Sequence, residues 1–447
     1  MKKLNLTVIV LLGISHFLSA QEDIKRIDSL IAQYHDNAEF TGSVLVAKGS
    51  KLLLNKAYGY GNTEHMIPNT TKTIFNIASL TKPFTAALIL KLSEEGKLSL
   101  DDMLTKYDPA YPNGSKISIR NLLTHTSGIA NYTDDKTFRA MDQGKEVNLQ
   151  QMMAFFKDKP LEFEPGTKFR YSNSGYRMLG YIIERVTAMS YAQALERCIF
   201  KPLGMQHTSY GPPVTDKNLA KGYMMYYKNF SHPSFAVHPS ISDATGAIYS
   251  TVEDLYKWHL ALQGNKFLSE ESLREAYQKN KGPYGFGWFT DSLYGKQRVS
   301  HDGNIQGFKA NINRIPEDNV CVIALSNANS SSVGGMVRNI MNILYDQPLS
   351  KTFAEQPVMA MPDSVKQSFA GIYRFRQEDS LKIAVYIKDA KLIVAIDGQP
   401  EFQIEPVSRN AFKSGQTRVE FMINKEGKPE QIFIYRKGEI MGAGKAR

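Results

Sequence analysis

One short stretch, residues 77–82, constrains this chain most, because it contains the only Ser-x-x-Lys of the 447-residue sequence. A hydroxyl and an amine three residues apart share one face only if the segment is helical. Apolar residues continue at helical spacing after Ser79 as far as Gly96, which predicts a helix that ends there. Pro83 is tolerated only in the first turn of a helix, so Ser79 is expected at or just before the helix start.

The chemistry that this pair can perform is nucleophilic catalysis. A serine hydroxyl is a weak nucleophile until a neighbouring base takes its proton. Lys82 can be that base if burial lowers the pKa of its amine. A helix-capping Ser79 followed by a solvated lysine explains the same four residues equally well. The assignment therefore depends on the rest of the chain.

Residues 1–20 have the pattern of a secretory signal peptide. Lys2 and Lys3 precede an apolar run that ends at Leu18, and Ala20 stands before a polar segment. The run is shorter than the ~20 apolar residues that a membrane span needs, and no later segment has a transmembrane pattern. These features predict an exported protein, periplasmic in a bacterium.

The composition excludes several classes of partner and cofactor. The net charge is +10, but no dense Lys/Arg run is present, so nucleic acid is not an expected partner, whereas anionic cell-wall material is compatible with this charge. Cys198 and Cys321 are predicted to be buried free thiols. No Cys/His set has zinc spacing, so the sequence predicts no metal and no other cofactor.

Hydrophobic periodicity predicts a mixed α and β organisation. An amphipathic helix is expected over residues 24–36, and a β-hairpin over 42–47 and 51–58. Residues 98–265 are mostly helical and rich in turns. An antiparallel series of strands and a closing helix are then predicted at residues 284–288, 298–300, 310–315, 320–326 and 335–345.

Two polar clusters in the middle of the chain are candidates for the site. Tyr171-Ser172-Asn173 follows a Pro-Gly turn, and in an extended segment Tyr171 and Asn173 point the same way. A tyrosine beside a cation can act as a base, and an asparagine amide can bind an acyl-amide group. Tyr-x-Asn recurs three times elsewhere, so a structural tyrosine remains the alternative. His125, in the cluster 122–128, is either catalytic or a partner of local backbone groups.

A third polar cluster, His301-Asp302-Gly303-Asn304, follows a predicted strand. Glycine lets a backbone approach a ligand closely, and a strand N–H such as that of Asn304 can stabilise an oxyanion.

These three motifs, in this order and at this spacing, resemble the serine β-lactamase and penicillin-binding-protein superfamily. The branch concerned holds class C β-lactamases, D-Ala-D-Ala carboxypeptidases and related esterases. The resemblance covers residues 25–345 and is supported by the phrases at 122–128 and 202–205. It implies an α+β fold, with an antiparallel sheet, flanking helices and an all-helical lobe, and a site between sheet and lobe.

The resemblance also implies a role for each motif residue. The implied catalytic residues are Ser79 as nucleophile with Lys82 and Tyr171 for proton transfer, and the implied substrate-binding residues are Asn173, His301, Gly303 and Asn304. The backbone N–H groups of Ser79 and Asn304 would form the oxyanion hole.

The third motif departs from the family pattern, because His301-Asp302-Gly303 stands where many members have Lys-Thr-Gly. Unless Asp302 points away, its charge disfavours the carboxylate of penicillin or of a D-Ala-D-Ala peptide. No counterpart of the class A deacylating glutamate is found. The expected function is therefore an exported serine hydrolase of amides or esters, most simply a D-Ala-peptide carboxypeptidase. The alternatives are a carboxylesterase, a weak β-lactamase, or a sensor that is acylated without turnover.

The end of the chain changes character. Residues 346–362 contain three prolines and little periodicity, which predicts a linker between a hydrolase domain (21–345) and a small β domain (363–447). Strands are predicted at 381–387, 391–396, 417–423 and 431–435, which favours a small barrel or sandwich. This region resembles the lipocalin-like tails of some superfamily members and carries no catalytic cluster.

Overall fold

The computed structural model describes residues 21–37, 39–226, 231–264, 266–329, 331–350, 353–374, 382–415, 417–424, 426–436 and 439–446. The predicted signal peptide, residues 1–20, lies outside the described residues. Among the helices that are described, none combines the length and the apolar character that a membrane crossing requires. Cys198 and Cys321 are free, as predicted, although only Cys321 is fully buried.

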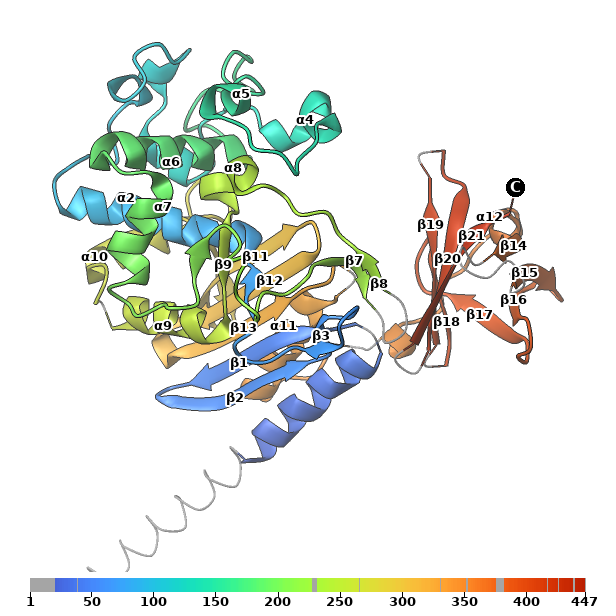
Figure 1. The fold of residues 1–447 in the computed structure, drawn as a ribbon. Coiled ribbons are helices and arrows are strands. Elements are labelled where there is room, and N and C mark those ends of the chain that lie inside the picture. The colour runs from blue at the N-terminus through green and yellow to red at the C-terminus, as the bar shows by residue number, and fades with distance from the viewer. Residues whose placement is uncertain are drawn as a thin grey trace, which may run out of the picture.

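A six-stranded antiparallel sheet forms the centre of the larger unit (Figure 1). Its strands in spatial order are β10 (Phe289–Leu293), β11 (Lys296–Ile305), β12 (Phe308–Ile315), β13 (Val320–Ser326), β1 (Gly42–Lys48) and β2 (Lys51–Tyr58). The predicted hairpin is confirmed, because β1 pairs with β2 and Lys48 faces Lys51 across the turn. The edge between β1 and β13 joins segments far apart in the sequence, with Gly42 opposite Ser326.

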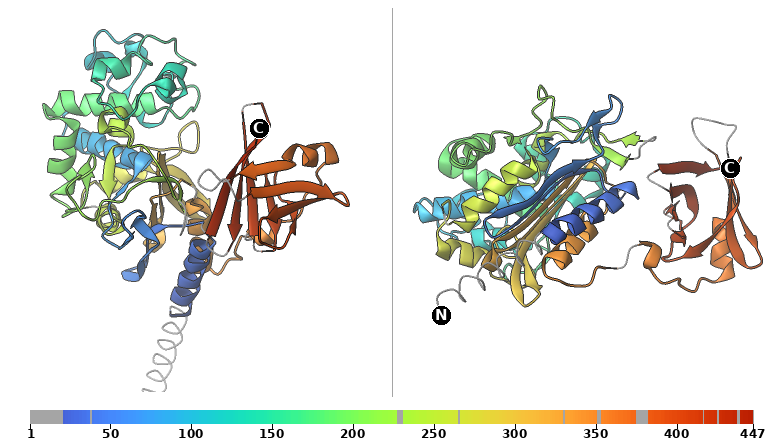
Figure 2. Two further views of the ribbon diagram at one scale, coloured as in Figure 1. Left: turned by 45° about the vertical axis from the view of Figure 1, so that its right-hand side comes forward. Right: turned by 90° about the horizontal axis from the view of Figure 1, so that it is seen from below.

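The two faces of the sheet have separate hydrophobic cores. A helix over residues 21–36 and α11 (Val333–Leu344) cover one face, where Val44, Val322 and Ile340 are fully buried (Figure 2). The opposite face, which carries Leu45 and Ile323, packs against α2 (Thr81–Glu94) and α9 (Val252–Gln263). Alternate residues of one strand thus supply both cores, as the period of two in a β-strand requires.

A helical lobe lies above α2 in Figure 1, as predicted for residues 98–265. Its helices are α3 (Ile119–Leu123), α4 (Lys136–Ala140), α5 (Leu149–Met153), α6 (Asn173–Thr187), α7 (Tyr191–Leu195) and α8 (Pro239–Ser242); α10 (Glu270–Ala276) leads back towards the sheet. Short strands also occur, namely β3 (Tyr60–Asn62) with β4 (Ile67–Pro68), β7 (Tyr223–Tyr226) with β8 (Ser231–Pro233), and β5 (Phe75–Asn76), β9 (Ile248–Ser250) and β6 (Ser209–Tyr210) in one small sheet.

The prediction of a strand at residues 284–288 is wrong. Only an isolated bridge from Tyr284 to Phe289 occurs there, and β10 begins at Phe289. The reason lies in the glycines of this segment. A Cβ on Gly285 would lie 2.1 Å from the Ala276 carbonyl oxygen, and Gly287 has φ +81° where it crosses α2. The segment is a close-packed loop, which only glycine permits.

The C-terminal region is a closed eight-stranded barrel. Its strands are β14 (Gly371–Arg374), β15 (Lys382–Lys388), β16 (Lys391–Ile396), β17 (Phe402–Pro406), β18 (Ala411–Ser414), β19 (Thr417–Ile423), β20 (Pro429–Arg436) and β21 (Glu439–Lys445). The predicted β fold is confirmed, and pairing of Tyr373 with Lys445 closes the barrel. The sequence did not predict β17, β18 or β21.

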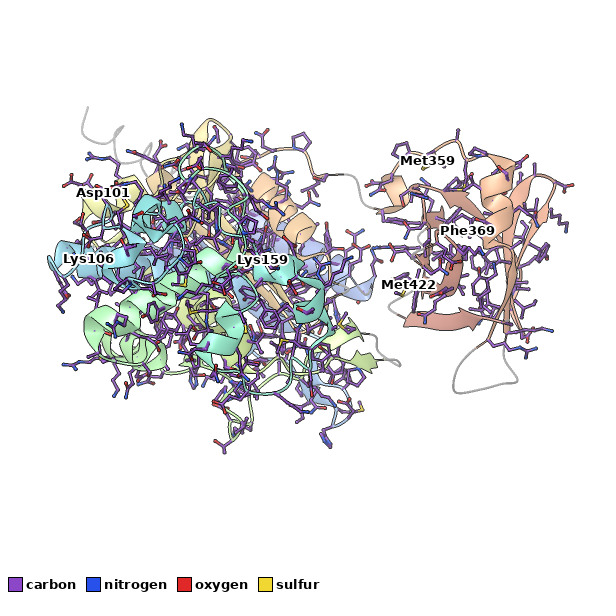
Figure 3. The ribbon with its side chains drawn as sticks, turned by 90° about the horizontal axis from the view of Figure 1, so that it is seen from above. Asp101, Lys106, Lys159, Met359, Phe369 and Met422 are labelled. Carbon is purple, nitrogen blue, oxygen red and sulfur yellow. The ribbon has the colours of Figure 1, made fainter. Side chains whose placement is uncertain are left out.

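A short helix that was not predicted, α12 (Asp363–Phe369), precedes the first strand of the barrel. Phe369 at its end enters the barrel, where its ring lies 4.7 Å from that of Phe421 and 5.0 Å from that of Phe412 between centroids (Figure 3). Side chains such as Ile383 and Ile434, both fully buried, complete this core. Side chains therefore fill the barrel interior, as is usual for eight strands.

Candidate active site

Ser79 lies on a single turn of 3-10 helix, η1 (Ala78–Leu80), directly before α2. This is the position predicted from Pro83, which falls in the first turn of α2. The turn is held in an unusual conformation, because Ala78 has φ +49° and its N–H donates to Asn76 Oδ1 at 2.7 Å. A non-glycine residue in the left-handed region is strained, and such strain concentrates at functional sites.

Lys82 lies beneath Ser79 and is completely buried. Its Nζ is in hydrogen-bond contact with Ser79 Oγ at 3.1 Å and donates to the Thr245 carbonyl oxygen at 2.9 Å. Among the residues that the structure describes, no carboxylate forms an ion pair with this amine. Burial therefore lowers the pKa of Lys82 well below its usual range. An amine held neutral beside a hydroxyl is the arrangement that a general base requires.

Tyr171 completes a cluster of three side chains. Its ring centroid lies 5.0 Å from Lys82 Nζ, and its hydroxyl hydrogen-bonds with Ser79. Burial raises the pKa of the phenol, and the contact with Ser79 only partly opposes this rise. Tyr171 is consequently a protonated phenol, suited to relay a proton and not to remove one at the start of the reaction.

Asn173 does not continue the extended segment that the sequence analysis assumed. The extended chain stops at Ser172, and Asn173 is the first residue of α6. Its backbone N–H and its Nδ2 both donate to Asn131 Oδ1, at 3.0 and 3.3 Å. Tyr171 therefore meets Ser79, while Asn173 faces the neighbouring cavity.

The third motif lies within β11. Pairing of β10 with β11 ends at Ser300, so residues 301–305 pair only with β12 and leave their other edge beside η1. His301 is 1% exposed; its Nδ1 lies 2.7 Å from the Asp302 carbonyl oxygen and its Nε2 lies 2.8 Å from Tyr284 Oη. With its proton on Nδ1, His301 donates to the Asp302 carbonyl oxygen, and its Nε2 accepts from the Tyr284 hydroxyl. Burial is the main cause that lowers the pKa of His301 to about 3.

Gly303 faces η1 at a distance that excludes any side chain. A Cβ there would lie 2.3 Å from the Ile77 carbonyl oxygen and 3.1 Å from Ala78 Cβ. The next residue, Asn304, lines the cavity, and its Oδ1 accepts a hydrogen bond from Asn329 Nδ2 at 2.9 Å. The glycine thus allows β11 to lie against the nucleophile turn.

Gly303→Ala is expected to destabilise the protein by about 2–3 kcal/mol, because overpacking against backbone forces one of the two segments to move. The same shift separates β11 from Ser79, so covalent labelling of Ser79 should fall at least about tenfold. Urea unfolding and a labelling time course measure the two effects. Gly334→Ala is the matched control, since a Cβ there meets nothing within 4 Å. Normal labelling with an unchanged unfolding midpoint would show that the contact is not tight.

Asp302 points away from Ser79. It alternates with His301 and Gly303 along β11, so its side chain lies on the opposite face of the sheet. Asn311, directly opposite on β12, donates Nδ2 to Asp302 Oδ1. Burial raises the pKa of Asp302, and the hydrogen bond from Asn311 and the charge of Arg298 oppose that rise. Asp302 was expected to disfavour anionic substrates unless it points away from the site. Because it does point away, this expectation does not apply.

Several residues of the site were not found by sequence reasoning. The Thr245 carbonyl accepts from Lys82, Tyr284 meets His301, and Asn131 orients Asn173. Each lies between 17 and 163 positions from its partner, and none belongs to a recognisable motif. Only folding brings them together.

A cavity of about 290 Å³ opens beside Ser79, between the helical lobe and β11. Polar and apolar groups line it: Ser79, Thr133, Arg139, Gln143, Asn173, Ser242, Thr245, Gly246, Asn304 and Gln306, with Ala78, Tyr132, Phe138, Val237, Ile241 and Ile305. Two amides, Asn173 and Asn304, flank the nucleophile. Within the described ranges, no group of His, Cys, Asp and Glu side chains could hold a metal ion.

Comparison with known proteins shows which family the chain resembles. The family model described as Beta-lactamase matches residues 27–344. A penicillin-binding protein of Bacillus subtilis (strain 168) is 28% identical over 445 residues, which cover 94% of this chain and 98% of that protein. The solved penicillin-binding protein of Bacillus halodurans is 28% identical with a TM-score of 0.64, covering 71% of this chain and 98% of the other.

The likeness extends to the C-terminal barrel. The octameric penicillin-binding protein homologue from Pyrococcus abyssi superposes with a TM-score of 0.66 over 94% of this chain and 100% of the other, at 24% identity. At that identity the match shows the shared fold alone.

Proposed function

The chain belongs to the Beta-lactamase family, and on that premise we propose that it is a serine hydrolase that forms an acyl-enzyme on Ser79 and hydrolyses amides. One observation carries the proposal: a fully buried amine, Lys82 Nζ, lies 3.1 Å from Ser79 Oγ. The substrate class that we propose is a D-Ala-terminated peptide of the cell-wall type, cleaved by a carboxypeptidase-like reaction.

The acylation step follows from the protonation states of the three side chains. Neutral Lys82 takes the proton from Ser79 Oγ as the oxygen attacks the substrate carbonyl carbon. The negative charge that develops on the carbonyl oxygen is stabilised by backbone N–H groups, for which Ser79 and Asn304 are the candidates. The carbon–nitrogen bond then breaks, and the leaving amine receives a proton through Tyr171. Water attacks the acyl-enzyme in the same manner and releases the acid.

The cavity supports an amide substrate over a small ester. The side chains of Asn173 and Asn304 can donate to and accept from a peptide group at once. Phe138, Val237 and Ile241 offer an apolar wall for the acyl side chain. Arg139 is the cation among the lining residues, but its Nη2 lies 3.2 Å from Asp134 Oδ1, which reduces its pull on an anionic substrate.

The proposal is tested by intact-mass measurements on the full chain mixed with benzylpenicillin, together with detection of D-alanine released from a D-alanyl-D-alanine peptide. We expect a penicillin adduct on Ser79 and release of D-alanine, and Ser79→Ala should lose both. Adducts at another residue, or equal activity in Ser79→Ala, would refute the assignment of the nucleophile.

An esterase is the second candidate, and one observation favours it. The family's third-motif lysine is replaced by His301, a neutral imidazole, so the site lacks the usual cation for a substrate carboxylate. Fast turnover of an uncharged ester, with neither a penicillin adduct nor D-alanine release, would select this candidate.

We further propose that the protein is exported and acts on material of the cell envelope. The predicted signal peptide and the net charge of +10 support this placement. The sequence from 346 to 362 would then serve as the linker to the barrel.

A further inference from the structure

His125 is a buried residue that the proposed mechanism does not use. It is 1% exposed, does not line the cavity, and has φ +55° in the turn after α3. From sequence alone, this histidine is either catalytic or a partner of local backbone groups. Its contacts favour a partner of local backbone groups, and they show which backbone groups His125 holds.

The contacts of His125 bracket Tyr171 on both sides. The N–H of Arg170 donates to the His125 carbonyl oxygen at 2.9 Å, and the N–H of Ser172 donates to His125 Nδ1 at 3.2 Å. In a β-bridge, two carbonyl oxygens would accept these two N–H groups. Here the His125 carbonyl oxygen accepts one of them, and the side-chain Nδ1 of His125 accepts the other. The two backbone groups that flank Tyr171 are fixed by one residue.

The imidazole also supports the phenol ring directly. The ring centroids of His125 and Tyr171 lie 4.2 Å apart, compared with 4.5 Å to Tyr284 and 5.0 Å to Tyr176. Because Nδ1 accepts a hydrogen bond, the proton of the neutral ring is on Nε2. In the part of the chain that the structure describes, Nε2 has no hydrogen-bond partner. The ring is thus oriented by the hydrogen bond to Nδ1 and by tilted contacts with the neighbouring tyrosine rings.

We propose that His125 is a positioning residue that places the Tyr171 hydroxyl at Ser79; the catalytic consequence rests on the proposed function. The essential atom is the Nδ1 acceptor. An error of about 1 Å in the position of a proton-transfer group can cost roughly 100-fold in rate.

Two amide substitutions at His125 distinguish the positioning of Tyr171 from a general effect on stability. His125→Asn places an amide oxygen where Nδ1 lies, whereas His125→Gln places its oxygen near the site of Nε2. We expect the rate constant for labelling of Ser79 by a fluorophosphonate to stay within about threefold of wild type for Asn. For Gln it should fall by about 10- to 100-fold. Equal loss in both variants, or loss in neither, would overturn the proposal.

A double-mutant cycle tests whether the effect passes through Tyr171. In a Tyr171→Phe background, His125→Gln should reduce labelling by less than about twofold further. A full additional loss would overturn the proposal, because it would show that His125 acts independently of the phenol. His125→Phe, which keeps a ring and lacks the acceptor, replaces Gln if the Gln variant does not fold.

A second readout does not depend on activity. In protein labelled with ¹³C at tyrosine Cζ, the Tyr171 signal, assigned through Tyr171→Phe, should move in His125→Gln and stay in His125→Asn. Absence of wild-type labelling at Ser79 would refute the proposed function, and this spectrum would still decide the role of His125. Identical Tyr171 signals in wild type and His125→Gln would overturn the positioning role.

Discussion

Lys82→Met is expected to lower the rate of Ser79 acylation by about 100- to 10,000-fold, the range typical of losing a general base. The variant should fold normally. Lys82 is fully buried, and a methionine of similar shape fills the same space without an amine that burial desolvates. The free energy of unfolding should therefore hold or rise while the activity is lost.

Time-resolved intact mass with benzylpenicillin measures the acylation rate, and urea unfolding measures the stability. Lys91→Met is the matched control on the same helix, because Lys91 is partly exposed and lies 3.7 Å from Glu94. It should leave acylation unchanged. If Lys82→Met acylated at the rate of wild type, Lys82 would not be the base.

The second large effect is a loss of stability in weak acid, caused by buried neutral histidines. Burial, aided by Arg314, lowers the pKa of His259 to about 3, and burial is the main cause that lowers the pKa of His301 to about 3. Burial also lowers the pKa of His125 well below its usual range. Arg314 Nε donates to His259 Nδ1 at 2.9 Å, so protonation there would place two cations in contact.

The sign of the effect follows from the order in which the two states bind protons. Below pH 6.5 the histidines bind protons in the unfolded chain but stay neutral in the folded protein. Their contribution to the free energy of unfolding is therefore fully present above that pH and is lost progressively towards pH 3. Each histidine contributes at most about 1.4 kcal/mol per pH unit. The free energy of unfolding should therefore fall steeply between pH 7 and pH 5, above the range in which most carboxylates titrate.

Urea unfolding at several pH values checks this slope. His259→Asn keeps an acceptor for Arg314 and removes the titrating ring, so it should flatten the slope by the share of one histidine. His65→Asn, at an exposed position, should not alter it. A wild-type slope near zero between pH 7 and pH 5 would show that the buried rings do not govern acid stability.

Local patterns predicted much of the fold, because they depend on neighbours in the chain. The helix after Ser79, the first hairpin and strand β13 follow from periodicity and turn residues. The predictions failed where a distant contact overrides the pattern. Residues 284–288 have the composition of a strand, yet their glycines are required by close contact with α2 and α10. The helix at residues 363–369 was not predicted, and its last residue, Phe369, packs against Phe421 in the barrel.

The sequence by itself indicated which residues gather at the site, since the order and spacing of three motifs carry the family resemblance that implies their roles. Tertiary structure decided what those residues can do. A lysine becomes a base only when folding removes its water, as it does for Lys82. Strand alternation and Asn311 turn Asp302 away from Ser79. His125 reaches Ser172 across 47 positions. The protonation and orientation of these side chains depend on solvent exclusion and on contacts between distant segments. Local sequence patterns predict neither of these.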